Sequence, residues 1–444
     1  MSSLNQYLQF FEANRAAIDS HAPEAMNCRR DAALATLRRL ARFPDRGDEG
    51  FEVVSLEDMY APDYGINIAR VSFGEGGKSG VHGCDIPNVG TISASVVNDT
   101  FVNDYQRALP EGVELMSLAR AAELYPDCLS RSVAPADNAV VALNDLLLQD
   151  GVYIRVHRGV SLPKPIQILS LFNASMPLMA VRRIVVDVED NASAIVITCD
   201  HPRTTEVDYL ACRVVDIRLG RGASLDFNDL EEATARCSRS SVITAVQGAD
   251  SDLHISSITL DGGVTRNEYY VSHLGDGCHT SVNGIVVAGG TQVVDNASYV
   301  VHDHEHCTSD QLFKYALFDS AQGGFEGLVN VRHGARFTDA AQSNRNLLVS
   351  PQARMHAMPQ LVIDCDDVKA SHGSATGQLN ADALFYMQSR GIPADEARMI
   401  LINAFMAEGM EKIKHEPLRS TLLMLLDRRL RGCSDSCAAC HGHH

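Results

Sequence analysis

The sequence predicts a mainly β protein in which a stacked β-solenoid is flanked by helical segments at both ends of the chain. Short apolar or alternating runs follow one another between about residues 136 and 378, with small turn residues between them. Apolar residues at helical spacing occur in the first and last parts of the chain, and no helix-length periodic segment interrupts the middle. A doubly wound sheet needs helices between its strands, so the pattern disfavours that class, while a β-sandwich stays open.

The composition is that of a globular protein, with 444 residues of which 45% are apolar and 21% charged. The formal net charge of −18 disfavours nucleic acid or an anionic membrane as a partner, because both require clustered cations. The N-terminus lacks the apolar core of a signal peptide, and no apolar run approaches the length of a membrane span. We therefore expect a cytoplasmic protein without a membrane partner, in which the 12 cysteines are thiols.

Residues 1–135 are predicted to form an N-terminal helical and mixed segment. Two apolar stripes at helical spacing support this prediction, one with Leu4, Tyr7, Leu8 and Phe11 and one with Ala33, Leu37, Leu40 and Phe43. Pro44 is expected to end the second helix.

A glycine-rich stretch from Phe73 to Gly80 resembles a phosphate-binding loop at first sight. That motif needs a glycine where Ser72 stands, and no clear strand-then-helix frame surrounds it. We expect a flexible loop there and no nucleotide hydrolysis by this chain.

Residues 136–378 are predicted to form the solenoid core. Similar turns recur next to the apolar runs, as in Asn191-Ala192-Ser193, Gly222-Ala223-Ser224 and Gly248-Ala249-Asp250. A small residue at each corner followed by an apolar strand is typical of a β-solenoid. One coil cannot bury its inward face alone, so the coils must stack.

Residues 379–432 are predicted to form a C-terminal helical segment. Asn380 can cap a helix that runs to Arg390, with Gly391 just past its end, and Pro393 suits the first turn of the next helix. The main apolar stripe of that next helix contains Ala397, Ile400, Leu401, Ala404 and Phe405, and Met399, Ile402 and Met406 widen it. A helix that is apolar on more than one face needs additional cover, from a helix at 418–430 or from a protein partner.

Two segments contain residues that can bind metal. His302, His304 and His306 would share one face of a strand, where they could hold a transition metal with ligands from elsewhere; a solvated polar face is the alternative.

The second of these segments is a Cys/His-rich tail, residues 433–444. It contains Cys433, Cys437, Cys440 and His441 at C-x3-C-x2-C-H spacing. We expect it to bind zinc or iron in vitro, although ligation by so short a segment can be adventitious. The spacing does not match a standard zinc finger.

His372 stands in the segment from Cys365 to Gly377, where the strand-like pattern gives way to the helical one. Small residues surround it, and Asp366 and Asp367 precede it. Such a segment fits a shaped surface better than a helix or a core strand. From the pattern alone, His372 is either a structural surface histidine or a soft-metal ligand or proton carrier at a subunit junction.

From about residue 280 to 412 the chain resembles the SufB/SufD family of iron–sulfur cluster assembly scaffolds. The matching words are HCTSDQLFK at 306–314, GLVNV at 327–331, NRNLLV at 344–349, PQL to HG at 359–373 and LFYMQSRGI at 384–392. A weaker match covers residues 42–49. The chain is similar to the SufD-like member, because Asn344 stands where the SufB-like member has a cysteine and Ser371-His372-Gly373-Ser374 replaces its Glu-His-Glu-Ala word.

The resemblance implies a right-handed parallel β-helix flanked by helical segments. It also implies a heterodimer with a SufB-like scaffold and binding of a SufC-like ABC-type ATPase by the C-terminal helical region. The candidate residues for ATPase binding are Phe385, Tyr386, Arg390 and Gly391. A homodimer of the chain when it is alone is a further option.

For His372 the resemblance implies a place at the interface between the two scaffolds. There an imidazole can ligate iron or help to hold a transient Fe or Fe–S cluster. No cofactor would be bound permanently. ATPase activity would belong to the partner, so this chain would have no catalytic residue of its own.

Two other functions stay open. A cytosolic β-helix enzyme acting on carbohydrate would need clustered charged side chains, whereas Asp187, Asp216 and Asp226 are scattered along the sequence. A metal or cluster carrier would use the tail from Cys433 to His444.

Overall fold

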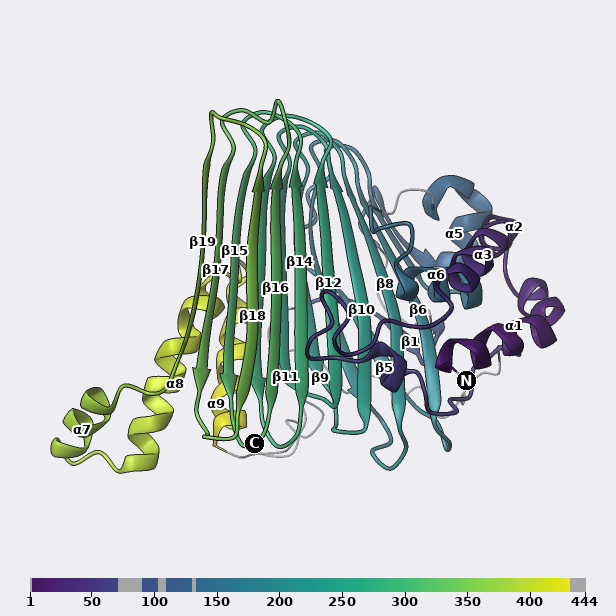
Figure 1. Ribbon diagram of the computed structural model, residues 1–444. Helices are drawn as coiled ribbons and strands as arrows, with labels where there is room; N and C mark the ends of the chain where they lie inside the picture. The colour runs from purple at the N-terminus through teal and green to yellow at the C-terminus, as the bar shows by residue number, and fades with distance from the viewer. Residues whose placement is uncertain (1, 71–89, 103–108, 130–132, 432–444) are drawn as a thin grey trace.

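The middle of the protein is a β-solenoid built from two sheets that face each other (Figure 1). The computed structural model describes residues 2–70, 90–102, 109–129 and 133–431. Within these ranges, sheet 1 has the strand order β19-β17-β15-β13-β11-β9-β7-β5-β1-β2, and sheet 2 has the order β18-β16-β14-β12-β10-β8-β6-β4-β3.

The strands of sheet 1 are β1 (Ile92–Val97), β2 (Thr100–Val102), β5 (Ile166–Phe172), β7 (Ser193–Pro202), β9 (Ser224–Glu232), β11 (Asp252–Asp261), β13 (His279–Ala288), β15 (Thr308–Leu317), β17 (Asp339–Leu348) and β19 (Lys369–Gly377). Those of sheet 2 are β3 (Val113–Ser117), β4 (Val152–Val156), β6 (Leu178–Val188), β8 (Tyr209–Leu219), β10 (Cys237–Gln247), β12 (Val264–His273), β14 (Val293–His302), β16 (Gln322–Val331) and β18 (Arg354–Ile363).

Successive coils stack in parallel register. His279 of β13 pairs with Thr308 of β15, and Val293 of β14 pairs with Gln322 of β16, one coil further along the chain. The only antiparallel pairs among the described strands are β1 with β2 and β3 with β4, at the N-terminal end of the solenoid. The predicted parallel β-helix with flanking helical segments is therefore confirmed, and the β-sandwich is excluded.

The corners that lead from sheet 2 into sheet 1 explain the recurrent turns of the sequence. In six of these corners a residue with left-handed backbone conformation precedes a small buried residue, and the strand follows. The left-handed positions are Asn191, Gly222, Asp250, Gly277, His306 and Phe337. The buried positions after them are Ala192, Ala223, Ser251, Cys278, Cys307 and Thr338. Glycine, Asn and Asp adopt the left-handed conformation at low cost, which is why they recur at the corners.

Apolar side chains from both sheets fill most of the interior. Valine, isoleucine, leucine and phenylalanine from alternate strand positions form one continuous cluster along the solenoid. Gly284 shows how closely the coils pack, because a Cβ at this position would lie 2.2 Å from the ring of Phe313 on the next coil.

One part of the interior is ionic. Six charged side chains there are almost fully buried: Arg182, Arg213, Arg239, Asp200, Asp229 and Glu231. Arg213 of β8 donates to both carboxylate oxygens of Asp229 on β9, at 2.6 and 2.5 Å. Arg239 of β10 pairs with the same aspartate at 3.4 Å and with Glu231 at 3.2 Å. Because the arginines belong to sheet 2 and the carboxylates to sheet 1, the network links the two sheets.

The N-terminal helices cover the outer face of sheet 2, on the right in Figure 1. They are α1 (Ser3–Ser20), α2 (Glu24–Asn27), α3 (Arg30–Leu40), α4 (Leu56–Met59), α5 (Leu118–Leu124) and α6 (Ala139–Leu147), with a 3-10 turn at Pro126–Leu129. The two predicted apolar stripes lie on α1 and α3. Helix α3 ends at Leu40 and not at Pro44, because Ala41 takes a left-handed conformation.

Helix α6 corrects the prediction that no helix interrupts the middle segment. Asn138 caps it by accepting hydrogen bonds from the N–H groups of Val140 and Val141. Most of its residues are buried, because α3 covers one side and sheet 2 the other. Its sequence is therefore an almost continuous apolar run, without the one-sided stripe by which a surface helix is recognised. Strands β1, β2 and β3 also precede residue 136.

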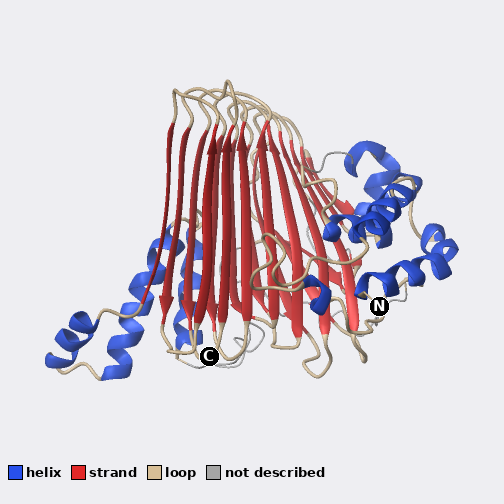
Figure 2. Cartoon of the chain, viewed as in Figure 1, coloured by secondary structure: helices blue, strands red, loops and turns tan. Residues whose placement is uncertain are grey.

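The C-terminal helices α8 (Ala394–Glu411) and α9 (Glu416–Leu430) lie against the outer face of sheet 1 (Figure 2). Their shared cluster includes Ile402 and Met406 of α8, Leu418 of α9 and Ile285 of β13. The predicted contact between α8 and the helix at 418–430 is confirmed. None of the helices in the described ranges is both long and apolar enough to cross a bilayer.

The predicted main stripe of α8 coincides only in part with its buried face, since Ala397 is buried and Phe405 packs against the sheet 1 cluster. Ile400 is 43% exposed, whereas Ile402, Met406 and Met410 are buried against the sheet. The helix has apolar residues on several faces, so the pattern alone could not determine which face the sheet covers.

Candidate functional site

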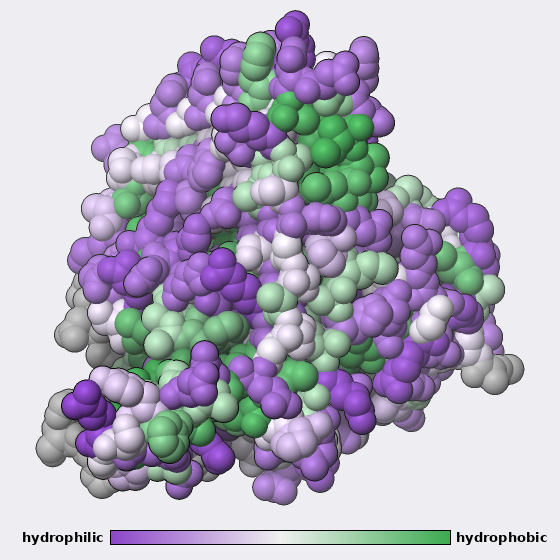
Figure 3. All heavy atoms as spheres, turned by 60° about the vertical axis from the view of Figure 1, so that its left-hand side comes forward, coloured by the Kyte–Doolittle hydropathy of each residue, from purple (hydrophilic) through white to green (hydrophobic). Residues whose placement is uncertain are grey.

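The solenoid is open at the end where β18 and β19 lie. They are the last strands of sheets 2 and 1, and within the described part of the chain no further strand pairs with them. Figure 3 turns this end toward the viewer and shows apolar patches among polar side chains. Val362 and Ile363, at the end of β18, are 42% and 43% exposed. Edge strands of this kind can pair with a strand of another chain.

His372 lies near the middle of β19, where it is exposed and in register with Gln342 of β17. The N–H of Lys369, at the start of β19, donates to the carbonyl of Thr338 at 2.8 Å. The direction of the backbone hydrogen bonds alternates along a parallel strand. The backbone N–H and C=O of His372 therefore point away from β17, toward the open edge.

The side chain of His372 continues a row that lines the interior. The row runs from Val282 on β13 through Gln311 on β15 and Gln342 on β17 to His372. A Cβ added to Gly327 of sheet 2 would lie 2.2 Å from Nε2 of Gln342, so the Gln342 side chain reaches across the interior. The lining thus changes from apolar to amide to an exposed imidazole as the open end is approached.

Side chains of β17 hold β19 in place beside this row. Ser374 Oγ donates to Asn344 Oδ1 at 3.0 Å, and Asn346 Nδ2 donates to Thr376 Oγ1 at 3.1 Å. The two asparagine amides also bond to each other, at 2.6 and 3.0 Å. Partly buried polar contacts therefore help to fix the last strand, and Ala370 at its start packs against a small apolar cluster that includes Ala340.

The two edge strands differ in their capacity to pair. In β18 the N–H of Arg354 donates to Ala321, which places the backbone of Pro359 on the open edge. Proline has no N–H and interrupts pairing there. The edge-facing residues of β19 are Ala370, His372, Ser374 and Thr376, all of which have an N–H. Strand β19 is thus the better acceptor for a partner strand.

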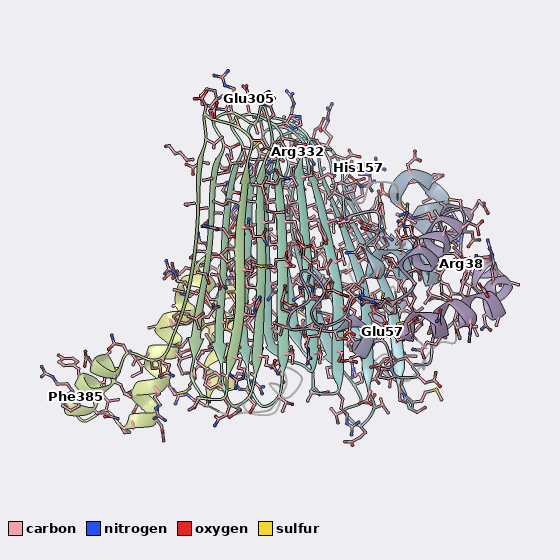
Figure 4. All side chains as sticks on the ribbon, viewed as in Figure 1. Arg38, Glu57, His157, Glu305, Arg332 and Phe385 are labelled. Carbon is pink, nitrogen blue, oxygen red and sulfur yellow. The ribbon has the colours of Figure 1, made fainter. Side chains whose placement is uncertain are left out.

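Helix α7 (Ala381–Ser389) projects from the solenoid beyond β19 (Figures 1 and 4). None of its residues is buried, and Phe385 and Tyr386 are 72% and 59% exposed. The Arg390 guanidinium lies 5.2 Å from the Tyr386 ring centre, and Gly391 follows with a φ of +87°. The cap by Asn380 is as predicted, since its Oδ1 accepts from the N–H groups of residues 382 and 383. An apolar helix without cover indicates a docking surface.

Comparison with known families identifies the family of the chain. The family model described as the SUF system FeS cluster assembly, SufBD core domain, matches residues 171–405, and the model of the SufBD protein N-terminal region matches residues 1–168. The chain belongs to the SufBD family. The core match includes β19 with His372 and the projecting helix α7.

Similar proteins have names from the same assembly system. A SufBD family iron–sulfur cluster assembly protein of Synechocystis sp. is 28% identical over 407 residues, 88% of this chain and 87% of that protein. SufD of Bacillus subtilis is 24% identical over 337 residues, 73% of this chain and 76% of that protein. SufD of Escherichia coli is 33% identical over 183 residues, 41% of this chain and 43% of that protein. The SufD names agree with the SufD-like assignment made from the sequence.

In this SufBD chain, Asn344 is a buried structural residue. Its Nδ2 donates to the carbonyl of Phe313 at 3.4 Å in addition to the bonds with Asn346 and Ser374. The position at which the sequence lacks the SufB-like cysteine is therefore occupied by a side chain that stabilises the last coil. The aspartates that precede His372 lie in the corner before β19, where Asp367 forms an exposed ion pair with Arg336 at 3.0 Å.

The prediction that His302, His304 and His306 share a strand face is wrong. Strand β14 ends at His302, and the next residues form a corner in which His306 has a φ of +57° (Figure 4 labels the neighbouring Glu305). His302 is buried and its Nε2 contacts Ser309 Oγ at 2.8 Å, and burial lowers the pKa of this imidazole to about 4. His304 contacts Asp303 instead, at 3.0 Å. The sequence around these histidines does not show that the strand ends at His302, so the prediction continued the strand alternation into the corner.

Two other predicted segments lie outside the described residues. They are the glycine-rich stretch from Phe73 to Gly80 and the tail with Cys433, Cys437, Cys440 and His441.

The three aspartates considered for a carbohydrate enzyme do not converge. Asp216 pairs with Arg183 and Asp187 with Arg218 on sheet 2, while Asp226 lies on sheet 1.

One group of ligand-type side chains was missed by the sequence analysis. Asp252, His254 and His279 offer ligand atoms that all lie within 4.8 Å of one another, on the outward face of sheet 1. The sequence signal that could have revealed this group is the Asp252-x-His254 pattern at the start of β11, followed by His279 at the start of β13, the next strand of the same sheet. It becomes a cluster only when the coils are stacked in register.

Proposed function

We propose that this SufBD-family protein is a non-catalytic, cytoplasmic scaffold subunit of the SUF complex. In this proposal it pairs with a SufB-like scaffold through the open end of its solenoid and binds a SufC-like ABC-type ATPase through α7 and the start of α8. The single observation that supports it most is the exposed inner lining at the open end, where His372 stands beside an unpaired strand edge.

The open end is built to be continued by another chain. The side chains of His372, Ser374 and Thr376 occupy register positions that face the interior in the earlier coils, yet no further coil of the described chain covers them. Their backbone groups also lack strand partners among the described residues. A partner strand added to β19 would satisfy the backbone and enclose the imidazole together with side chains of the partner. In the absence of the partner, a second copy of the chain can use the same edge.

His372 supplies a chemically suitable group for the cargo of the complex. An imidazole nitrogen ligates iron, and Fe–S clusters accept histidine in place of cysteine. One imidazole cannot hold a cluster alone, so thiolates from the partner scaffold would complete the ligand set. The iron or cluster is transient cargo in this proposal and not a resident cofactor.

Helix α7 supplies the second docking surface. Its exposed aromatic pair, Phe385 and Tyr386, and the stacked Arg390 are the kinds of residue that dominate protein interfaces. ATP-driven closure of the partner would pull on α7 and α8, and α8 packs directly on strands β13 and β15. The motion would thereby reach the coils close to the open end.

Co-expression with a SufB-like scaffold and a SufC-like ATPase tests the scaffold pairing. Ser374→Pro removes an edge-facing N–H of β19, whereas Ser374→Ala keeps that N–H and loses only the hydroxyl bond to Asn344. We expect affinity purification to recover at least about tenfold less partner scaffold with the proline variant, because proline blocks strand addition. The alanine variant should recover a near-normal amount. Equal recovery with both variants, at unchanged circular dichroism, would contradict pairing through β19.

The ATPase contact has a separate test. The double variant Phe385→Ser, Tyr386→Ser should lose the ATPase from the purified complex while it retains the partner scaffold, because the aromatic anchors contribute most of a small interface. Leu124→Ser is the matched control, since Leu124 is an exposed apolar residue, 46% accessible, on the N-terminal helix α5. Retention of the ATPase by the double variant would place its binding surface elsewhere.

A further inference from the structure

Asp252, His254 and His279 form a compact cluster on the outward face of sheet 1. His254 Nε2 contacts Asp252 Oδ1 at 2.8 Å, and the two imidazole ring centres are 5.4 Å apart. Asp252 and His254 begin β11, and His279 begins β13, where it is in register with Asp252. The ligand atoms of all three residues lie within 4.8 Å of one another. A metal ion bound at about 2.0–2.2 Å from each ligand atom would require the three atoms to lie within about 4.4 Å of one another, so the side chains would have to close around the ion.

A fourth ligand-type side chain, Asp226, lies on the neighbouring coil and is not one of the three residues whose ligand atoms lie within 4.8 Å of one another. Asp226 of β9 is in register with His254 and shares its outward face. It is 94% buried by its relative exposure of 6%, and neither carboxylate oxygen has a hydrogen bond of normal geometry within the described structure. A buried carboxylate without a partner is costly, and a bound cation would compensate for it.

A bound metal ion would compete with Lys414 for the carboxylate of Asp252. Lys414, between α8 and α9, donates to the other oxygen of Asp252 at 2.9 Å. Nδ1 of the His279 ring contacts Thr308 Oγ1 at 2.7 Å. The second nitrogen of His279 is thereby oriented by a hydrogen bond, as is usual for a metal ligand.

We propose that Asp252, His254 and His279, with Asp226 as an additional carboxylate, form a binding site for one divalent first-row transition metal ion. Two imidazoles with carboxylates suit zinc, iron and cobalt, and disfavour calcium and magnesium, which prefer oxygen ligands alone. The site is independent of the proposed scaffold role, because it lies on β11 and β13 on the outward face and His372 lies on β19 in the inward-facing row. Metal and Lys414 would compete for Asp252.

Cobalt titration of the full-length chain tests the site. The Cys/His tail is a second potential ligand set, so the background has the substitutions Cys433→Ser, Cys437→Ser, Cys440→Ser, His441→Ala, His443→Ala and His444→Ala. We expect one equivalent of Co²⁺ to bind, with visible absorption bands of nitrogen and oxygen ligation and without thiolate charge-transfer bands. His254→Gln or His279→Gln should weaken binding at least about 100-fold, beyond the effect of losing an outer-shell partner.

The matched control is His304→Gln, because His304 also contacts an aspartate, at 3.0 Å, but belongs to no three-ligand group among the described residues. It should bind Co²⁺ as the background does. Lys414→Gln should tighten Co²⁺ binding several-fold, because it removes the ammonium that competes for Asp252. A gain in affinity cannot result from a destabilised fold, so this variant tests the site independently of the two histidine variants. The proposal would be overturned if the background protein did not bind Co²⁺ stoichiometrically, or if His254→Gln and His279→Gln both bound Co²⁺ as tightly as the background. Weaker Co²⁺ binding by Lys414→Gln than by the background would also overturn it.

Discussion

Replacing Asp229 by Ala is expected to lower the free energy of unfolding by about 3–5 kcal/mol, the usual effect of breaking a buried ion pair. Asp229 is fully buried and accepts bonds from Arg213 and Thr198, with Arg239 close by. Without it, the arginine charges remain buried with too few counter-charges. Urea denaturation followed by circular dichroism measures the change.

The pH dependence of this effect has a definite sign. Burial raises the pKa of the Asp229 carboxyl, but the charges of Arg213 and Arg239 outweigh burial and hold the pKa well below its ordinary value. A carboxyl with a depressed pKa stabilises the fold above its unfolded pKa of about 3.9 and loses that contribution as the pH falls below it. The stability difference between the wild type and Asp229→Asn should therefore be constant above about pH 5 and shrink below about pH 4.

Glu123→Ala is the control for Asp229. Glu123 forms an exposed pair with Arg120 at 2.7 Å, and an exposed pair contributes little. The urea midpoint of the Glu123→Ala variant should match that of the wild type. A similarly small change for Asp229→Ala would contradict the view that the interior network holds the two sheets together.

His372→Ala is expected to reduce Fe–S cluster formation on the assembled complex by at least about tenfold, while the complex itself is retained. Under the proposed function, His372 supplies one ligand to the transient cluster at the scaffold interface, and the alanine variant removes that ligand. Cluster formation is followed by its visible absorption after anaerobic supply of iron and sulfide, with subunit composition checked by gel filtration. His372→Cys, which restores a ligand, should recover part of the activity.

Three outcomes are distinguishable for His372. Loss of the complex in His372→Ala would make the residue structural, and unchanged cluster formation would remove it from the chemistry. If both His372→Ala and His372→Cys lost cluster formation to the same extent while the complex stayed intact, iron ligation by residue 372 would also be contradicted, because a thiolate is a good iron ligand.

The general form of the solenoid could be predicted because its signals are local. Corners such as Asn191-Ala192-Ser193 combine a residue that tolerates the left-handed conformation with a small buried residue, and apolar strands follow. The cap of α7 by Asn380 is equally local. Prediction failed where the local pattern had more than one solution, as in the all-round apolar α6, the choice of face on α8 and the end of β14 before His304.

The candidate site was predictable only in part. The segment around His372 was recognised by its words, but its exposure and its place in an inward-facing row depend on which strand is last in the stack. The same holds for Asn344, whose buried bonds to β19 are invisible in its own segment.

The sequence by itself determined the stacked-coil architecture and the family, because turn chemistry, strand alternation and motif words are all contained within one coil. It also singled out His372 as a candidate residue, and the role of His372 stays a prediction. Only the tertiary structure decided that β19 offers an open edge, that Arg213 meets Asp229 in the interior and that Asp252, His254 and His279 converge. These neighbours come from different strands and coils, and the register that joins them is fixed by the packing of the whole solenoid.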